Sequence, residues 1–248
     1  MNFKDKRIIV TGAASGFGAA IARHLAAAGA RVLVADLNAE GAQAMANSLS
    51  QQGGQALACA VDVSKQNDVA RMAQTAVDAW GGIDVLVNNA GTTHKNKPAL
   101  DVTEDEFDRI FRVNVKGLFW ATQSVLPIMM RQRSGCVVNV ASTTGVRPGP
   151  GLTWYSATKA AMINATKGLA LEMIERHRCH APIQQEPCAG SRPDPGSPPG
   201  NSRYQGRRGL EVRLLAALRH APGDEAVDGR EPVGIEWRKL IFGQSLFP

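Results

Sequence analysis

Short runs of apolar residues alternate with longer segments of helical periodicity over about the first 175 residues of the chain. The apolar runs contain few polar positions, which is typical of strands covered on both faces. The runs predicted as strands are Arg7–Thr11, Arg31–Asp36, Gln55–Asp62, Val85–Asn88 and Cys136–Ala141. The segments predicted as helices are Gly18–Ala28, Ala39–Gln52, Lys65–Trp80, Thr103–Gln132 and Thr153–Glu175.

Local signals mark several of the predicted helix ends. Gly29 follows the first helix and is a natural C-terminal stop. Ser64 is the predicted N-cap of the third helix. Thr103 and Glu106 have the spacing of a capping box, so a helix is expected to open there. The stretch from Thr103 to Gln132 is predicted as one helix or as two consecutive pieces.

The alternation of strands and helices predicts the α/β class, with a Rossmann-type doubly wound parallel sheet and helices on both faces. We assign this domain to residues 1–175. We assign residues 176–248 to a separate tail of atypical composition.

The composition changes after residue 175. Residues 182–209 contain six prolines and five glycines, and the Arg:Lys ratio goes from 9:8 before residue 176 to 10:1 after it. Proline removes donors from a strand ladder, and glycine raises the entropy cost of ordering. We therefore expect no regular structure in 182–209, a short helix at Leu210–Leu218, and no sixth or seventh strand. The outer edge of Cys136–Ala141 is then expected to be bare.

Two explanations of the tail stay open. A shifted reading frame in GC-rich DNA yields the Arg, Pro, Gly and Ala that dominate it. The other explanation is a genuine specialised tail, in which four residues can be offered as zinc ligands. They are His177, Cys179, His180 and Cys188. Their spacing fits no standard zinc finger, so no metal site is predicted.

The net charge of +6 is divided evenly, with +3 in residues 1–175 and +3 in residues 176–248. No basic stripe interleaved with aromatic residues is visible, so nucleic-acid binding is not expected. No apolar run approaches the ~20 residues of a membrane span, and the charged N-terminus is unlike a secretory signal. We expect a cytoplasmic protein, and four cysteines are too few for a disulfide framework.

A glycine-rich turn lies between the first strand and the first helix. Its glycines permit a tight turn and close backbone approach, and the helix N-terminus presents free N–H groups to a pyrophosphate. The candidate cofactor contacts in the turn are Thr11, Gly12, Ser15, Gly16, Phe17 and Gly18.

Asp36 ends the second predicted strand, 18 residues after Gly18. Its carboxylate can accept both hydroxyls of an adenosine ribose, and its charge repels a 2′-phosphate. Ser15 and Leu37 stand where cations would compensate such a phosphate. NAD is therefore favoured over NADP as the cofactor. Taken alone, Asp36 can equally be a helix-capping aspartate.

A second cluster consists of Ser142, Tyr155 and Lys159. Tyr155 and Lys159 are four residues apart and therefore share one helix face. A phenol titrates near about 10 in water, and an adjacent ammonium together with a positive nicotinamide ring favours the phenolate. This makes Tyr155 a candidate general acid/base, with the Ser142 hydroxyl beside it to hold the substrate oxygen. Alone, such a Tyr–Lys pair is more often a surface pair.

Together these motifs resemble the short-chain dehydrogenase/reductase family over about 150 residues. The matching residues are Thr11–Gly18, Asp36, Asp62, Val63, Asn88–Gly91, Asn114–Gly117, Ser142, Tyr155 and Lys159. The resemblance implies that Tyr155 donates or takes the proton while hydride moves to or from the nicotinamide. It also implies that Lys159 lowers the pKa of Tyr155 and binds the ribose hydroxyls.

The resemblance assigns supporting roles as well. It implies that Asn114 interrupts the long helix and holds a water that links Lys159 to solvent. It implies that Asp62 contacts the adenine amine, with Val63 beside it. The segment that would support the sheet and flank the cofactor ribose contains Asn88, Asn89, Ala90 and Gly91. From the residues alone, polar side chains at strand ends can instead cap turns, whereas a buried Asn114 needs partners.

The resemblance stops after Glu175. Family members continue into a sixth strand, a Pro-Gly motif that touches the cofactor, a substrate-covering segment and a seventh strand, which the sequence here does not resemble. The function expected is an oxidoreductase that transfers hydride between NAD(H) and a secondary alcohol or ketone. The alternative is a dinucleotide-binding member whose catalysis is impaired by the altered C-terminal third. A third possibility, a purely structural or interaction protein, would have to explain Ser142, Tyr155, Lys159 and Asn114 as a coincidence.

The substrate and the assembly are less defined. Residues expected near the cleft are His94, Lys95, Thr144, Arg147 and Trp154. Their cations favour an acidic or CoA-like substrate, or are solvated surface charge. The resemblance implies tetramers built through the two long helices and the final strand. Because that strand is expected to be missing, we predict a homodimer through the helices, using Trp120, Val125, Met129, Met162 and Leu169.

Overall fold

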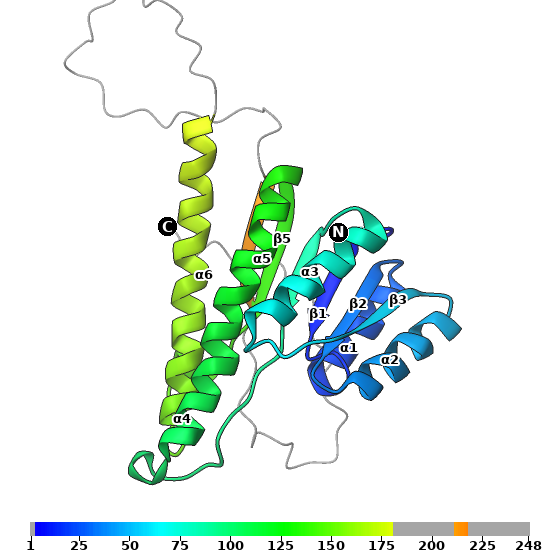
Figure 1. The fold of residues 1–248 in the computed structure, drawn as a ribbon. Coiled ribbons are helices and arrows are strands. Elements are labelled where there is room, and N and C mark those ends of the chain that lie inside the picture. Colours follow the sequence, from blue (N-terminus) through cyan, green and yellow to red (C-terminus); the bar gives the residue numbers. More distant parts are fainter. Residues whose placement is uncertain (1–2, 181–210, 218–248) are drawn as a thin grey trace, which may run out of the picture.

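The computed structural model describes residues 3–180 and 211–217, and these form a parallel sheet flanked by helices (Figure 1). The strands are β1 (Arg7–Thr11), β2 (Arg31–Asp36), β3 (Gln55–Ala60), β4 (Val85–Asn88), β5 (Ser134–Val140) and β6 (Glu211–Ala217). Their order in the sheet is β3-β2-β1-β4-β5-β6, and every pairing is parallel. This is the predicted doubly wound Rossmann arrangement.

The chain reverses its direction across the sheet at β1. From β1 it moves outward through β2 to β3, and it then returns to β4, on the other side of β1. The carboxyl ends of β1 and β4 therefore flank a topological switch point, where ligands bind in open α/β sheets. The fold places the glycine-rich turn after β1 and the Asn88–Gly91 segment at this point.

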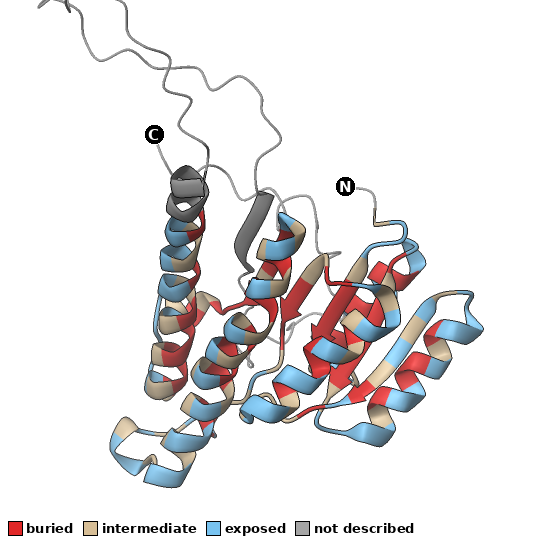
Figure 2. Ribbon diagram, turned by 45° about the horizontal axis from the view of Figure 1, so that its top comes forward, coloured by how far each residue is buried: buried red, intermediate tan, exposed pale blue. Residues whose placement is uncertain are grey.

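Helices cover both faces of the sheet. They are α1 (Gly16–Ala27), α2 (Ala39–Gln51), α3 (Gln66–Trp80), α4 (Glu104–Phe111), α5 (Gly117–Gln132) and α6 (Thr153–His180). Helices α1 and α2 pack on one face around Ile8, Val10 and Val32, while α3 and α5 pack on the other around Ile9 and Leu33. Buried residues accordingly line the strands and the helix faces turned toward them (Figure 2).

The predicted capping box is confirmed. The Thr103 hydroxyl accepts from the backbone N–H of Glu106, and the Glu106 carboxylate accepts from the backbone N–H of Thr103. The predicted cap at Ser64 is wrong, because the N-cap of α3 is Lys65. The Ser64 hydroxyl instead donates to Oδ1 of Asp62 at 2.7 Å, so it bonds to the segment after β3 and not to the first turn of α3.

The long helical stretch comes in two pieces, α4 and α5, joined by a π-helical segment at Arg112–Lys116. Asn114 lies at the centre of that segment and is 1% exposed. Single-turn π-bulges inside α-helices are frequent at functional sites. The interruption expected at Asn114 is therefore confirmed.

The sheet does not end at β5, as the sequence had led us to expect. Strand β6 pairs with β5 in parallel from Ser134↔Glu211 to Val140↔Ala217, and α6 lies beside it (Figure 1). Both the helix predicted at Leu210–Leu218 and the absent sixth strand are wrong. The edge of β5 offers unpaired backbone groups, and a proline-free run of β-compatible residues satisfies them in spite of its helical pattern.

Residues 181–210 and 218–248 lie outside the described part of the chain. The predictions of an irregular 182–209 segment and of an absent seventh strand fall on them. Within the part that is described, no helix is long and apolar enough to cross a membrane. The described residues also contain no cluster of ligands suited to a metal ion, and the side chains of all four candidate zinc ligands lie outside the description.

Candidate active site

A groove of about 870 Å³ opens at the switch point of the sheet. It is lined by residues that follow β1, β2, β3 and β4, together with part of α4 and the π-helical segment. They include Gly12, Ser15, Gly16, Phe17, Asp36, Asp62, Val63, Asn89, Ala90 and Gly91. Ten of the fourteen cofactor contacts predicted from the sequence therefore line one groove. The four that do not line it are Thr11, Gly18, Tyr155 and Lys159.

Backbone packing explains the glycines of the first turn. Gly12 has a φ of +64°, and a Cβ there would lie 2.9 Å from the Cα of Ala90. A Cβ on Gly18 would overlap the carbonyl oxygen of Gly12. Gly16 has a φ of +54° and open space around its Cα, so only its backbone conformation calls for glycine. The turn thus packs against the segment that follows β4, and Gly16 on its outer side has open space around it.

Thr11 and Asn89 join the ends of β1 and β4. The Asn89 amide donates to the carbonyl oxygens of Thr11 at 2.9 Å and Gly12 at 3.1 Å. The Thr11 hydroxyl accepts from the backbone N–H groups of Asn89 and Ala90. These bonds hold the two strand ends together directly beneath the groove.

Two carboxylates stand at the ends of β2 and β3. Oδ2 of Asp36 accepts from the Ala14 N–H and Oδ1 from the Asn38 N–H, both at 2.9 Å. Each carboxylate oxygen has a second acceptor site, so Asp36 can still accept hydroxyls from a ligand in the groove. Asp62 accepts from the backbone and hydroxyl of Ser64 at the neighbouring strand end.

The amide of Asn114 makes three hydrogen bonds. Its Oδ1 accepts from the Thr92 N–H at 2.8 Å, and its Nδ2 donates to the Thr92 carbonyl at 2.8 Å and to the Thr158 hydroxyl at 3.0 Å. The Thr158 hydroxyl in turn donates to the Tyr155 carbonyl at 2.7 Å. Asn114 therefore connects the loop after β4 to the first turns of α6.

Lys159 is 4% exposed, and its Nζ donates to the carbonyl of Val140, the last residue of β5, at 2.8 Å. The ammonium lies 5.8 Å from the ring centroid of Tyr155. A Cβ placed on Gly91 would lie 3.5 Å from Nζ and 3.2 Å from Oδ1 of Asn114. A side chain at position 91 would therefore be in ordinary contact with the ammonium and in tight contact with the Asn114 amide oxygen.

Ser142 lies two residues beyond the strand end that Lys159 contacts. It is fully buried, and its Oγ accepts from the backbone and hydroxyl of Thr144. The 3₁₀ turn Thr143–Gly145 packs against α6, since a Cβ on Gly145 would lie 2.8 Å from the carbonyl carbon of Lys159. The structure therefore brings all four predicted catalytic side chains to one end of the sheet.

Sequence reasoning missed Thr92, Thr158 and Arg109. Arg109 donates to the Thr92 hydroxyl at 2.7 Å and to the Thr93 carbonyl at 3.2 Å. Threonine is common in helices and loops, so only the position of Thr158 one turn after Tyr155 offered a signal. Arg109 lies on α4 and lines the groove, but nothing in its local pattern distinguishes it from a solvated charge.

Comparison with known proteins decides the family. Residues 6–180 match a sequence profile described as short chain dehydrogenase. The chain belongs to the short chain dehydrogenase family. The match ends close to the point where the sequence resemblance was seen to stop, and the family is one of oxidoreductases.

Two curated members of this family illustrate the range of similarity. The 4-formylbenzenesulfonate dehydrogenase TsaC1/TsaC2 of Comamonas testosteroni is 65% identical over 172 residues, which are 69% of this chain and 68% of that protein. The 3-oxoacyl-acyl-carrier-protein reductase FabG of Thermotoga maritima is 36% identical over 177 residues, 71% of this chain and 72% of that protein.

Solved structures of family members share the fold. The 3-ketoacyl-acyl-carrier-protein reductase of Brucella melitensis, complexed with NADH, has a TM-score of 0.70 at 32% identity and covers 88% of this chain and 77% of its own. A short chain dehydrogenase/reductase of Burkholderia phymatum in complex with NAD has a TM-score of 0.69 at 29% identity and covers 71% of this chain and 63% of its own.

Proposed function

We propose that the chain is an NAD-dependent oxidoreductase that transfers hydride between NAD(H) and an alcohol or carbonyl substrate. One observation carries the proposal. The Lys159 ammonium lies 5.8 Å from the centre of the Tyr155 ring, and both Lys159 and Asn114 lie next to Gly91, which lines the groove at the switch point of the sheet. The family and its NADH- and NAD-bound structural neighbours support it.

The groove fits a dinucleotide. The turn after β1 supplies backbone N–H groups at the start of α1, the place where a helix attracts a pyrophosphate. Asp36 supplies acceptors for the adenosine ribose, and its charge selects against a 2′-phosphate. Bound NAD supplies the hydride acceptor, and NADH the donor. The NAD-binding domain is proposed to comprise residues 1–175, with residues 176–248 as its atypical tail.

Tyr155 is proposed to exchange the proton with the substrate oxygen. The positive charge of Lys159 favours its phenolate, and the same ammonium, which donates to the Val140 carbonyl, is proposed to bind the ribose hydroxyls. Ser142 holds the substrate oxygen beside the phenol. Asn114 fixes the geometry through Thr92 and Thr158, because its amide holds both the loop after β4 and the start of α6.

The proposed substrates include an anionic aryl aldehyde. The relative with 65% identity is named for 4-formylbenzenesulfonate, so this compound joins the secondary alcohols and ketones as a candidate. Hydride leaves an aldehyde from its hydrate, where the carbon carries both a hydrogen and two hydroxyls. Loss of the hydride and of one hydroxyl proton gives the carboxylic acid. Tyr155 is the group placed to take that proton.

The second candidate function is dinucleotide binding with impaired turnover. The chain loses its resemblance to the family after residue 180, and substrate-covering segments belong to that part of family members. An NADH fluorescence titration run beside an assay of NADH formation separates the two functions. The first predicts binding and oxidation of 4-formylbenzenesulfonate or a secondary alcohol. Binding with no turnover of any such substrate contradicts it and favours the second.

A further inference from the structure

Three buried polar side chains are hydrogen-bonded in series from β4 through β5 to α6. The amide of Asn88 donates to Oδ1 of Asn139 at 2.8 Å, and Nδ2 of Asn139 donates to the hydroxyl of Thr166 at 2.9 Å. The Thr166 hydroxyl then donates to the carbonyl of Met162 at 2.7 Å. Asn88, Asn139 and Thr166 are 7%, 0% and 4% exposed, so these bonds are shielded from water.

The register of the sheet brings the two asparagines together. Asn88 and Asn139 are paired positions of the parallel strands β4 and β5, so their side chains lie on the same face of the sheet. Apolar contacts between a helix and a sheet have no preferred direction. A hydrogen bond has a defined length and angle, so the bond from Asn139 to Thr166 fixes where α6 lies along β5.

Both partners of this bond lie close in sequence to the proposed catalytic groups. Asn139 is followed directly by Val140, whose carbonyl accepts from the Lys159 ammonium. Thr166 lies seven residues after Lys159, which is two turns of α6 and ~10 Å along its axis, on the same helix face. Strand β5 therefore contacts one face of α6 at two points, and one of them is Lys159.

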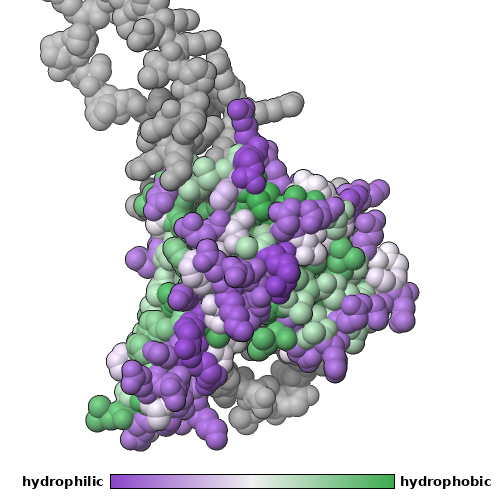
Figure 3. All heavy atoms as spheres, in the orientation of Figure 1, coloured by the Kyte–Doolittle hydropathy of each residue, from purple (hydrophilic) through white to green (hydrophobic). Residues whose placement is uncertain are grey.

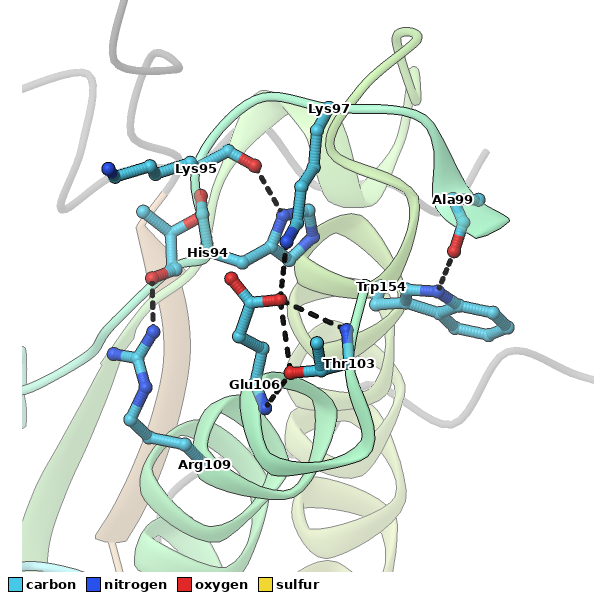
Figure 4. Close-up of polar contacts among 9 residues, drawn as sticks. His94, Lys95, Lys97, Ala99, Thr103, Glu106, Arg109 and Trp154 are labelled. Carbon is cyan, nitrogen blue, oxygen red and sulfur yellow. Dashed lines mark hydrogen bonds and ion pairs between the residues drawn. The ribbon is translucent and has the colours of Figure 1, made fainter. Parts of the chain in front are cut away.

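The first turns of α6 are attached to segments outside the sheet. Nε1 of Trp154 donates at 3.3 Å to the carbonyl of Ala99, in the 3₁₀ turn before α4 (Figure 4). The Thr158 hydroxyl accepts from the π-helical segment at 3.0 Å. The bond from Lys159 to β5 is made by the group that has to be placed, so it is not an independent support. The bond to Thr166 supplies such a support from the sheet.

The position of α6 against β5 sets the distance between the ammonium of Lys159 and the phenol of Tyr155. Tyr155 moves with α6, whereas the ammonium at the end of the long Lys159 side chain is bound to the Val140 carbonyl of β5. In this arrangement the ammonium lies 5.8 Å from the centre of the Tyr155 ring. A displacement of α6 along β5 would change that distance, and with it the stabilisation of the phenolate by the positive charge.

We propose that Asn139 and Thr166 are positioning residues, which act on the reaction by fixing α6 against β5. Neither side chain lines the groove, so both act through Lys159 and Tyr155. This inference rests on the proposed function, since it assigns two further residues to the same reaction.

The test removes the hydroxyl of Thr166 and keeps the shape of the side chain. Thr166→Val leaves Nδ2 of Asn139 without this acceptor, whereas Thr166→Ser keeps the hydroxyl and should restore wild-type behaviour. Thr122→Val on α5 is the matched control. The Thr122 hydroxyl also donates to a carbonyl one turn earlier, that of Leu118 at 2.8 Å, but it accepts from no donor among the described residues.

The kinetic readout separates positioning from binding. We expect Thr166→Val to lower kcat by about 5- to 20-fold, because a small misplacement of the reacting groups slows the chemical step. KM and the affinity for NADH should stay within about twofold, because the groove is unchanged. Thr122→Val should leave all three values unaltered. A kcat for folded T166V equal to that of T122V would overturn the proposal.

Titration of the phenol gives a readout that needs no turnover. The chain has two tyrosines, Tyr155 and Tyr204, so each variant is compared with its own Tyr155→Phe counterpart to isolate the phenolate absorbance of Tyr155. We expect the midpoint pH of this signal to rise in Thr166→Val by at least about half a pH unit, because the ammonium is less well placed. Thr166→Ser should restore it. A midpoint that T166V does not change would contradict the proposal.

A double variant covers the case in which Thr166→Val alone does not fold. Asn139→Leu combined with Thr166→Val removes the donor and the acceptor together, so neither side of this bond is left unpaired. We expect the double variant to show the same rise in the midpoint pH, and a wild-type midpoint would count against the proposal. If the midpoints behave as expected but no substrate is turned over, the proposed function fails and the positioning role stands.

Discussion

At the scale of single residues, the candidate site combines side chains whose positions follow from one strand end or one helix with Asn114, whose contacts depend on the fold. Gly12, Asp36 and Tyr155 could be predicted because their chemistry is tied to fixed positions after a strand or along a helix. The contacts of Asn114 could not be predicted. Its three hydrogen bonds join residues 22 and 44 positions away, and only the folded chain brings them together.

Asp36 is the residue on which cofactor choice depends. We expect Asp36→Ala to weaken NAD binding by about 1–3 kcal/mol, because charge-assisted bonds to the ribose hydroxyls are lost. The change should also reduce the difference between the affinities for NAD and NADP, because it removes a charge that repels the 2′-phosphate of NADP. Fluorescence titrations with NADH and NADPH measure both effects.

Asp36→Asn serves as the control, since it keeps an acceptor and loses only the charge. Asp36→Asn should reduce the difference between the affinities for NAD and NADP, and it should lose less NAD affinity than Asp36→Ala. A wild-type preference for NADPH would contradict the assignment of Asp36.

At the scale of elements, apolar runs and caps predicted five strands to within a few residues of their ends. The local sequence pattern gave wrong predictions where contacts with distant parts of the fold determine the structure. Ser64 has the residue type of an N-cap but donates to Asp62, and Glu211–Ala217 has a helical pattern but completes the bare edge of β5. The residues next to these positions in the sequence do not determine either outcome. Whether a strand edge has unpaired backbone groups that another strand can bind depends on the whole sheet.

The loop after β4 is attached to the N-terminus of α4 by Glu106. The Lys97 ammonium, and after it the backbone N–H of Thr103, lower the pKa of Glu106 from 4.5 to about 2. A lowered folded pKa stabilises the fold above the unfolded value, and this stabilisation is lost as the pH falls from about 4.5 toward about 2.

We therefore expect Glu106→Gln to lower the Tm near neutral pH, and the Tm difference from wild type to shrink across that interval. Thermal melts at a series of pH values measure it. Glu104→Gln in the same helical turn is the control, because the structure shows no ion pair for Glu104 among the described residues, and its Tm should differ little from wild type. A Tm difference for E106Q that is constant from pH 6 to about pH 2 would count against the attachment.

At the scale of the whole molecule, the long helices present an apolar surface, although its residues differ from those expected. Val125, Met129 and Met162 are interior residues, and Trp120 and Leu169 are partly buried against the core. Among the described side chains of α5 and α6, Phe119 and Leu171 are large, apolar and exposed, at 50% and 61%. Apolar residues also gather over the α6 side of the face seen in Figure 3.

We expect a homodimer through α5 and α6. Phe119→Asp should shift it to monomer in sedimentation velocity, because a buried charge opposes association, while NADH binding is kept. Leu100→Asp, at the fully exposed tip of the loop before α4, is the matched control and should leave the dimer intact. A compact tetramer that F119D does not alter would contradict this interface.

The central claim is that Tyr155 exchanges a proton while hydride passes to or from NAD in the groove beside it. Tyr155→Phe removes the phenol oxygen and almost no volume, so it tests the claim most directly. The account predicts that NADH binding stays within about twofold of wild type while turnover of the best substrate falls by about 100-fold or more. A variant that keeps more than about a tenth of the wild-type rate would show that Tyr155 is not the acid/base.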